Sequence, residues 1–122
     1  VGHAIEAHFA TTVHPWLHGE AVALGLRFVV FQAKDHAPEA CMFLDNWLRA
    51  YVPLPATPLA QWPDAGVLWA RMTHDKKNVA DQVVDVAWLG WGKAEWPVML
   101  EKSAFEATWV RFVRSFEEAG LT

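Results

Sequence analysis

The chain has 122 residues, a formal net charge of -4 and 53% hydrophobic residues, among them eight Trp against one Tyr. This length suits one domain with a buried core, and the scattered charges form no basic stripe of the kind that binds nucleic acid. Cys41 is the only cysteine, which excludes an intrachain disulfide framework and fits a reducing cytoplasm. No signal peptide opens the chain, and no apolar run reaches the roughly 18 residues of a membrane span, because Arg27 interrupts the longest one.

Helical patterns dominate the first half of the chain. Residues 2–10 are expected to form a helix or the end of one. Residues 11–16 are expected to form a loop, because Pro15 and three β-branched residues oppose a helix. Residues 18–34 are apolar nearly all round, which predicts a long, central and buried helix. Pro38 suits a first helical turn, and an apolar series with helical spacing follows it. The series is Cys41, Leu44, Trp47, Leu48 and Tyr51.

Prolines interrupt the middle of the chain. Residues 52–63 contain four prolines and predict an extended connection. Pro63 is then expected to open a further helix, which runs toward Lys76. The residues expected to face inward from this helix are Val67, Leu68 and Met72.

The last part of the chain mixes one strand-like stretch with a helix. Residues 83–91 alternate in the manner of a strand and are followed by Gly92, which predicts a short hairpin or an extended segment. Ser103 and Glu106 have the spacing of a capping box, and Gly120 is expected to close the helix that follows. The apolar stripe of this helix is Phe105, Trp109, Phe112 and Phe116. The fold class is therefore expected to be mainly α: a helical bundle with a short extended or β-hairpin segment.

Two histidine-containing segments are the candidates for chemistry. Residues 2–7 read Gly-His-Ala-Ile-Glu-Ala, and residues 17–25 read Leu-His-Gly-Glu-Ala-Val-Ala-Leu-Gly. A lone histidine is more often a packed or surface residue than a ligand. Pro15 also interrupts the turn that would align His14 with His18, so no helical two-histidine metal site is expected there. The histidines interpreted as ordinary packed or surface residues are His8, His14, His36 and His74.

Taken together, these two segments resemble the 3-dehydroquinate synthase family of sugar-phosphate cyclases. In that family a Gly-His-Ala-Ile-Glu helix is followed, after a loop, by a Leu-His-Gly-Glu-Ala-Val-Ala helix. Residues 71–78, Arg-Met-Thr-His-Asp-Lys-Lys-Asn, are similar to the family's Met-x-x-Asp-Lys-Lys-Asn segment and also follow a proline-rich connection. The resemblance covers nearly the entire chain. It implies that residues 1–122 are the C-terminal helical domain of a dehydroquinate synthase-like fold.

The resemblance implies a role for four residues. His18 matches a histidine that ligates a divalent metal ion, zinc or cobalt, and His3 matches an active-site histidine near the substrate. Lys76 and Lys77 match a pair that helps to bind the substrate carboxylate, whereas by themselves they would be interpreted as a solvated helix end. Glu20 is interpreted as an acid that faces the positive end of a helix dipole, not as a ligand.

The family reaction is an NAD- and metal-dependent elimination of phosphate and cyclisation of a seven-carbon keto-acid sugar phosphate, in the shikimate pathway. NAD is bound by an N-terminal domain that is absent from this chain, and two further metal ligands of the family also lie upstream. Val1 stands where a Met would begin a chain, so the natural start is expected upstream. The expected partners are the substrate and the NAD-binding domain, without nucleic acid or membrane, and the resemblance admits a homodimer. The isolated chain is expected to be inactive.

Two alternatives stay open. The first is a related cyclase of the inosose- or valiolone-forming type. The lysine pair argues against it, because a carboxylate substrate needs a cation. The second is a helical module that is not catalytic.

Overall fold

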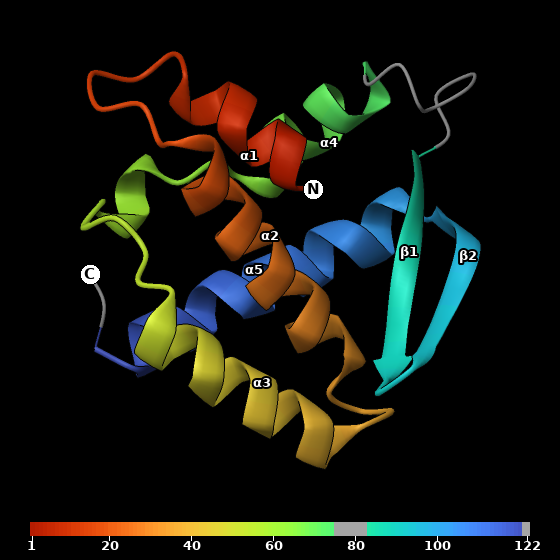
Figure 1. Cartoon of the computed structure of the whole chain (residues 1–122). Coiled ribbons are helices and arrows are strands. Elements are labelled where there is room, and N and C mark those ends of the chain that lie inside the picture. The colour runs from red at the N-terminus through yellow and green to blue at the C-terminus, as the bar shows by residue number, and fades with distance from the viewer. Residues whose placement is uncertain (75–82, 121–122) are drawn as a thin grey trace.

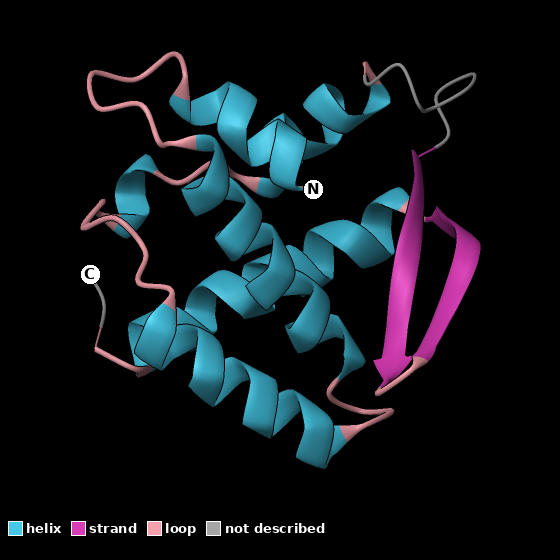
Figure 2. Ribbon diagram, in the orientation of Figure 1, coloured by secondary structure: helices cyan, strands magenta, loops and turns pink. Residues whose placement is uncertain are grey.

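The computed structural model describes residues 1–74 and 83–120, which form five α-helices, a short 3-10 turn and one antiparallel β-hairpin (Figures 1 and 2). The expected mainly helical fold with a β-hairpin is therefore confirmed. The helices are α1 (Gly2–Phe9), α2 (His18–Ala33), α3 (Pro38–Tyr51), α4 (Ala65–Thr73) and α5 (Lys102–Glu118). The strands are β1 (Val83–Gly90) and β2 (Lys93–Leu100), and the 3-10 turn is Leu59–Gln61.

Helix α2 is the element around which the others are arranged. It contacts α1, α3, α5 and β1, and Figure 1 shows α1 beside its first half, α4 on the far side of α1 and α3 below its second half. No helix within the described residues is both long and apolar enough to cross a membrane.

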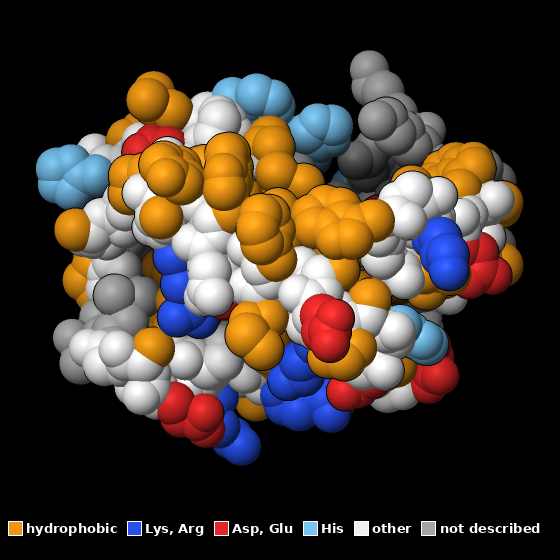
Figure 3. Space-filling view, turned by 60° about the horizontal axis from the view of Figure 1, so that its bottom comes forward, with side chains coloured by type: hydrophobic (Ala, Val, Ile, Leu, Met, Phe, Trp, Pro, Cys, Tyr) orange, Lys and Arg blue, Asp and Glu red, His pale blue; other side chains and the backbone are white. Residues whose placement is uncertain are grey.

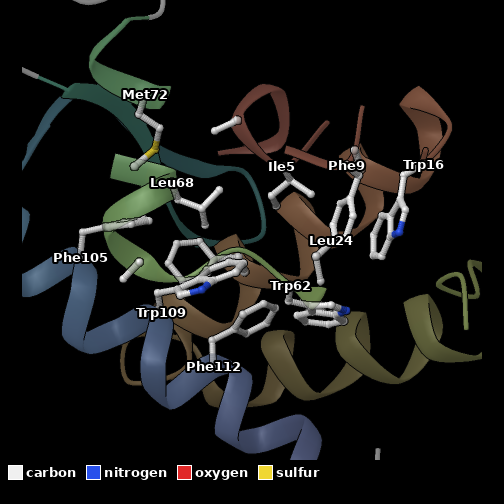
Figure 4. Close-up of a cluster of buried hydrophobic side chains, with 14 of the residues drawn as sticks. Ile5, Phe9, Trp16, Leu24, Trp62, Leu68, Met72, Phe105, Trp109 and Phe112 are labelled. Atoms are coloured by element: carbon white, nitrogen blue, oxygen red, sulfur yellow. The ribbon is translucent and has the colours of Figure 1, made fainter. Parts of the chain in front are cut away.

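The expected stripe of α5 is buried against α2, and it forms the centre of the main core (Figure 4). The Phe28 ring of α2 makes edge contacts with Phe105, Trp109 and Phe112, at centroid distances of 5.6, 5.3 and 5.2 Å. Trp109 is the largest fully buried side chain, and its indole N–H donates to the carbonyl oxygen of Pro63 at 2.9 Å. This hydrogen bond supplies the partner that a buried indole needs.

Two helices are less buried than their apolar residues suggest. Helix α2 is long and central as expected, but Val22 and Leu26 are exposed, so its expected burial holds for only part of its surface. In α3, Cys41 and Leu48 are buried, but Trp47 and Tyr51 face solvent. Figure 3, in which the lower side of Figure 1 comes forward, shows hydrophobic side chains gathered in a band across the surface. Hydrophobic residues at helical spacing do not by themselves indicate which side of the helix is covered by a neighbouring element.

Two predicted helix starts are also wrong in detail. Helix α4 begins at Ala65 rather than Pro63, because the Asp64 carboxylate accepts a hydrogen bond from the Val67 N–H at 2.8 Å and caps the helix. Val67 is exposed, contrary to expectation, whereas Leu68 and Met72 face inward as expected. Helix α5 begins at Lys102, so Ser103 lies inside the first turn and its hydroxyl donates to Glu101 instead of capping the helix.

The hairpin accounts for part of the Trp-rich stretch. Gly90 and Gly92 have positive φ angles of 126° and 69°, which let the chain reverse between the strands. The centroid of the Trp91 ring lies 5.4 Å from that of Trp88 and 5.9 Å from that of Phe43 in the first half of α3. These aromatic contacts join the hairpin turn to the helical part of the fold.

Candidate functional site

The two histidines selected from the sequence lie near one another where α1 packs against α2. His3 is in the first turn of α1, and His18 is the first residue of α2. Their ring centroids are 6.3 Å apart, with an angle of 32° between the ring planes. Both residues are exposed. The chain reverses direction between the two helices, so both imidazoles lie on one side of the molecule. Lys76 and Lys77 lie outside the described residues.

A carboxylate from α1 holds the His18 ring. Glu6 Oε2 lies 2.5 Å from His18 Nδ1, and both side chains are partly open to solvent. A carboxylate on Nδ1 fixes the ring orientation and leaves Nε2 as the nitrogen that can take a metal ion. Glu6 is three residues after His3, so the two side chains lie on neighbouring positions of one helix face.

Glu6 was not predicted as a site residue, although it belongs to the Gly-His-Ala-Ile-Glu segment. The signal was its spacing from His3, but nothing local in the sequence indicates that His18 lies next to it. That proximity depends on how α1 packs against α2. Glu20, in contrast, behaves as expected: its carboxylate accepts a hydrogen bond from the Leu17 N–H at 2.7 Å at the start of α2.

A shallow cavity of about 260 Å³ lies beside His3. Its floor is apolar and comes from the exposed side of α2, and the Asp85 carboxylate of β1 lies at its edge. The apolar residues that line it from α2 are Val22, Leu26 and Val29. The exposed side of α2 therefore contributes to the candidate site, and Asp85 is a second residue of this region that was not predicted.

His18 is a candidate metal ligand among the described residues. Among residues 1–74 and 83–120, no three His, Cys, Asp or Glu side chains are grouped closely enough to enclose an ion. His18 nevertheless has the chemistry of a zinc or cobalt ligand, since imidazole nitrogen is a preferred donor and a carboxylate orients the ring. Within the described residues, the geometry is therefore that of a single candidate ligand.

Comparisons of this chain with protein-family models, with curated proteins and with solved structures each found no match. The resemblance to the 3-dehydroquinate synthase family therefore depends on the two histidine segments and the Asp-Lys-Lys segment of the sequence.

Proposed function

We propose that this chain is the metal- and substrate-binding domain of a 3-dehydroquinate synthase-like carbon–oxygen lyase of the cytoplasmic shikimate pathway. The observation that carries the proposal is the proximity of His3 and His18. They come from the two most specific motifs, and their ring centroids lie 6.3 Å apart. His3 also lines a cavity on the same side of the molecule.

In this proposal His18 binds the divalent ion through Nε2, and the Glu6 carboxylate keeps Nδ1 protonated and the ring in place. The ion, when bound, supplies Lewis-acid polarisation of substrate hydroxyl oxygens, and NAD from the N-terminal domain supplies the hydride acceptor. His3 lies near His18 and lines the cavity, where its imidazole can donate or accept a proton at a substrate oxygen.

The lysine pair completes the proposed substrate site. Lys76 and Lys77 follow α4 in the sequence, and an ammonium group there is suited to the carboxylate of the keto acid. The substrate carboxylate distinguishes a dehydroquinate synthase from cyclases that act on carboxylate-free sugar phosphates. The same feature makes the proposal testable with two substrates.

The test is an assay of the protein encoded by the complete reading frame that contains this chain. Phosphate release is measured with NAD and either zinc or cobalt, from the seven-carbon keto-acid sugar phosphate and from a seven-carbon sugar phosphate that lacks the carboxylate. We expect release that depends on NAD and metal and is specific to the keto acid. Release from the carboxylate-free substrate alone would instead identify a related cyclase. Release from neither would leave a non-catalytic helical module.

A further inference from the structure

A second cavity, of about 430 Å³, lies between α2, α3 and α5. Arg27 lines it and is nine residues after His18 on α2, a separation of about 14 Å along the helix axis. No residue of the His3 and His18 site contributes to it. The apolar walls are Val30, Phe31, Met42, Phe112 and Phe116.

Arg27 is a buried cation without a full set of partners. The residue is 9% exposed, and its Nε has no hydrogen-bond partner within the part of the chain that the structure describes. The Asp45 Oδ1 atom is 3.7 Å from this nitrogen, which is an ion-pair distance but too long for a hydrogen bond. The guanidinium also lies over the Phe116 ring, 4.5 Å from its centroid.

Asp45 cannot fully neutralise Arg27, because its other oxygen is held by a second arginine. Asp45 Oδ2 lies 2.9 Å from Arg49 Nε, one turn further along α3. Lys34 and Asp35 also line the cavity, so the lining carries three cations and two carboxylates. One positive charge is left uncompensated.

Burial opposes the charged form of Arg27. Desolvation lowers the pKa of its guanidinium, Asp45 partly opposes this effect, and Arg49 adds to it. A buried charge with an unsatisfied donor is costly unless an anion or acceptor is supplied. Arginine pairs with carboxylates through parallel N–H bonds, so a carboxylate in the cavity would add a second counterion to Asp45, which Arg27 shares with Arg49.

We propose that this cavity binds a small monocarboxylate with an apolar, ring-sized body. The carboxylate accepts from Arg27, and the body lies against the aromatic side chains of α5. The cavity falls within the volume range of small-molecule sites, whose walls are mostly apolar with a few fixed polar groups. A single uncompensated positive charge favours a monoanion over a phosphate dianion, and the apolar walls favour an organic body over an inorganic ion. This inference does not depend on the proposed function.

The test is calorimetric titration of the chain with phenylacetate, with phenylacetamide and with inorganic phosphate as separate ligands. We expect binding of phenylacetate and at least roughly tenfold weaker binding of the neutral amide, since a charged hydrogen bond is lost. Phosphate binding as strong as phenylacetate binding would show that the site selects charge alone and would overturn the proposal. Equal binding of the acid and the amide would also overturn it.

Variants locate the site. Arg27→Met keeps an apolar stem, removes the charge and should weaken phenylacetate binding roughly tenfold or more. Arg114→Met makes the same change on the exposed side of α5, away from the cavity, and should leave binding unchanged. Arg49→Met removes a half-exposed cation of the cavity and provides a second test if Arg27→Met does not fold.

Cys41 gives an independent readout, because it is the only cysteine and it lines the same cavity. Saturating phenylacetate should slow its alkylation in the wild-type chain and not in Arg27→Met. Unchanged alkylation in the wild type despite saturation would place the ligand elsewhere and contradict the assignment.

Discussion

The backbone of Gly2 occupies the space that a side chain at Gly25 would need. A Cβ atom at Gly25 would lie 3.1 Å from the Gly2 Cα and 3.2 Å from the Gly2 nitrogen. The backbones of α1 and α2 are therefore in close contact one residue before His3.

Replacing Gly25 by Ala should destabilise the protein. Alanine favours a helix over glycine by about 1 kcal/mol, but here its methyl group meets backbone atoms that cannot rotate away. We expect a net loss of about 1–3 kcal/mol in the free energy of unfolding, measured by denaturant titration. Gly19→Ala is the matched control on the same helix, because nothing lies within 4 Å of its Cβ position. Equal stability changes in the two variants would contradict the packing.

Replacing Trp109 by Ala should cost about 3–5 kcal/mol, since it empties the centre of the core and leaves the Pro63 carbonyl without its indole donor. Val110→Ala, at the next position and about half exposed, should change stability by less than about 1 kcal/mol. A loss below about 1 kcal/mol for the Trp109 variant in the same titration would argue against its central position.

The sequence predicts the buried face of a helix well where one apolar stripe is unambiguous. The α5 stripe is such a case, because Phe105 to Phe116 leave only one face that can be buried. It predicts the buried face less well in α2 and α3, where apolar residues exceed the available core, although both helices lie where the sequence places them. Leu26 and Trp47 are exposed although their spacing suits burial. A local hydrogen bond also caps the start of α4, through Asp64.

The candidate site was predictable in its histidines and not in their neighbours. His3 and His18 belong to specific motifs, whereas Glu6 and Asp85 join them only through tertiary packing. Arg27 shows the same limit: in the sequence it is a single charge in an apolar helix, and only the fold reveals that its Nε is buried without a partner.

Substitution of the lysine pair tests the proposed recognition of the substrate carboxylate. In the protein from the complete reading frame, Lys76→Met or Lys77→Met should raise the KM for the keto-acid phosphate, because one cation is lost. Lys102→Met, at the exposed start of α5, serves as the control for loss of a surface charge. If both lysine variants had unchanged kinetics, Lys76 and Lys77 would be interpreted only as cations at a solvated helix end.

The Cys41 thiol should make the free energy of unfolding decrease at alkaline pH. Burial raises the pKa of its thiol above the ordinary value of 9.0, and the nearby Asp45 carboxylate raises it further. The folded state therefore holds this proton at a pH where the unfolded chain has released it. The resulting contribution to the free energy of unfolding is fully present below about pH 9, and it is lost as the pH rises through the folded-state pKa. The free energy of unfolding should fall more steeply above about pH 9 in the wild type than in Cys41→Ala, and parallel slopes would contradict this.

His18 is the residue on which the proposed metal chemistry depends most directly. In the protein from the complete reading frame, His18→Ala should remove the stoichiometric metal and the metal-dependent activity. Its side chain is 64% exposed, so the fold should remain intact by circular dichroism. Glu6→Gln should weaken metal affinity by about 10–100-fold, because the amide carries no charge to support the imidazole on Nδ1.

His14→Ala, on the exposed loop before α2, is the matched control and should retain full metal content. The 122-residue chain alone should bind zinc or cobalt weakly or not at all, since one imidazole cannot hold an ion that normally takes three or four ligands. Elemental analysis of the purified variants decides the matter. Equal stoichiometric metal in the wild type and His18→Ala would show that His18 is not a ligand. A loss of bound metal in His18→Ala, with unchanged metal content in Glu6→Gln, would support His18 as a ligand. It would contradict the orienting role of Glu6.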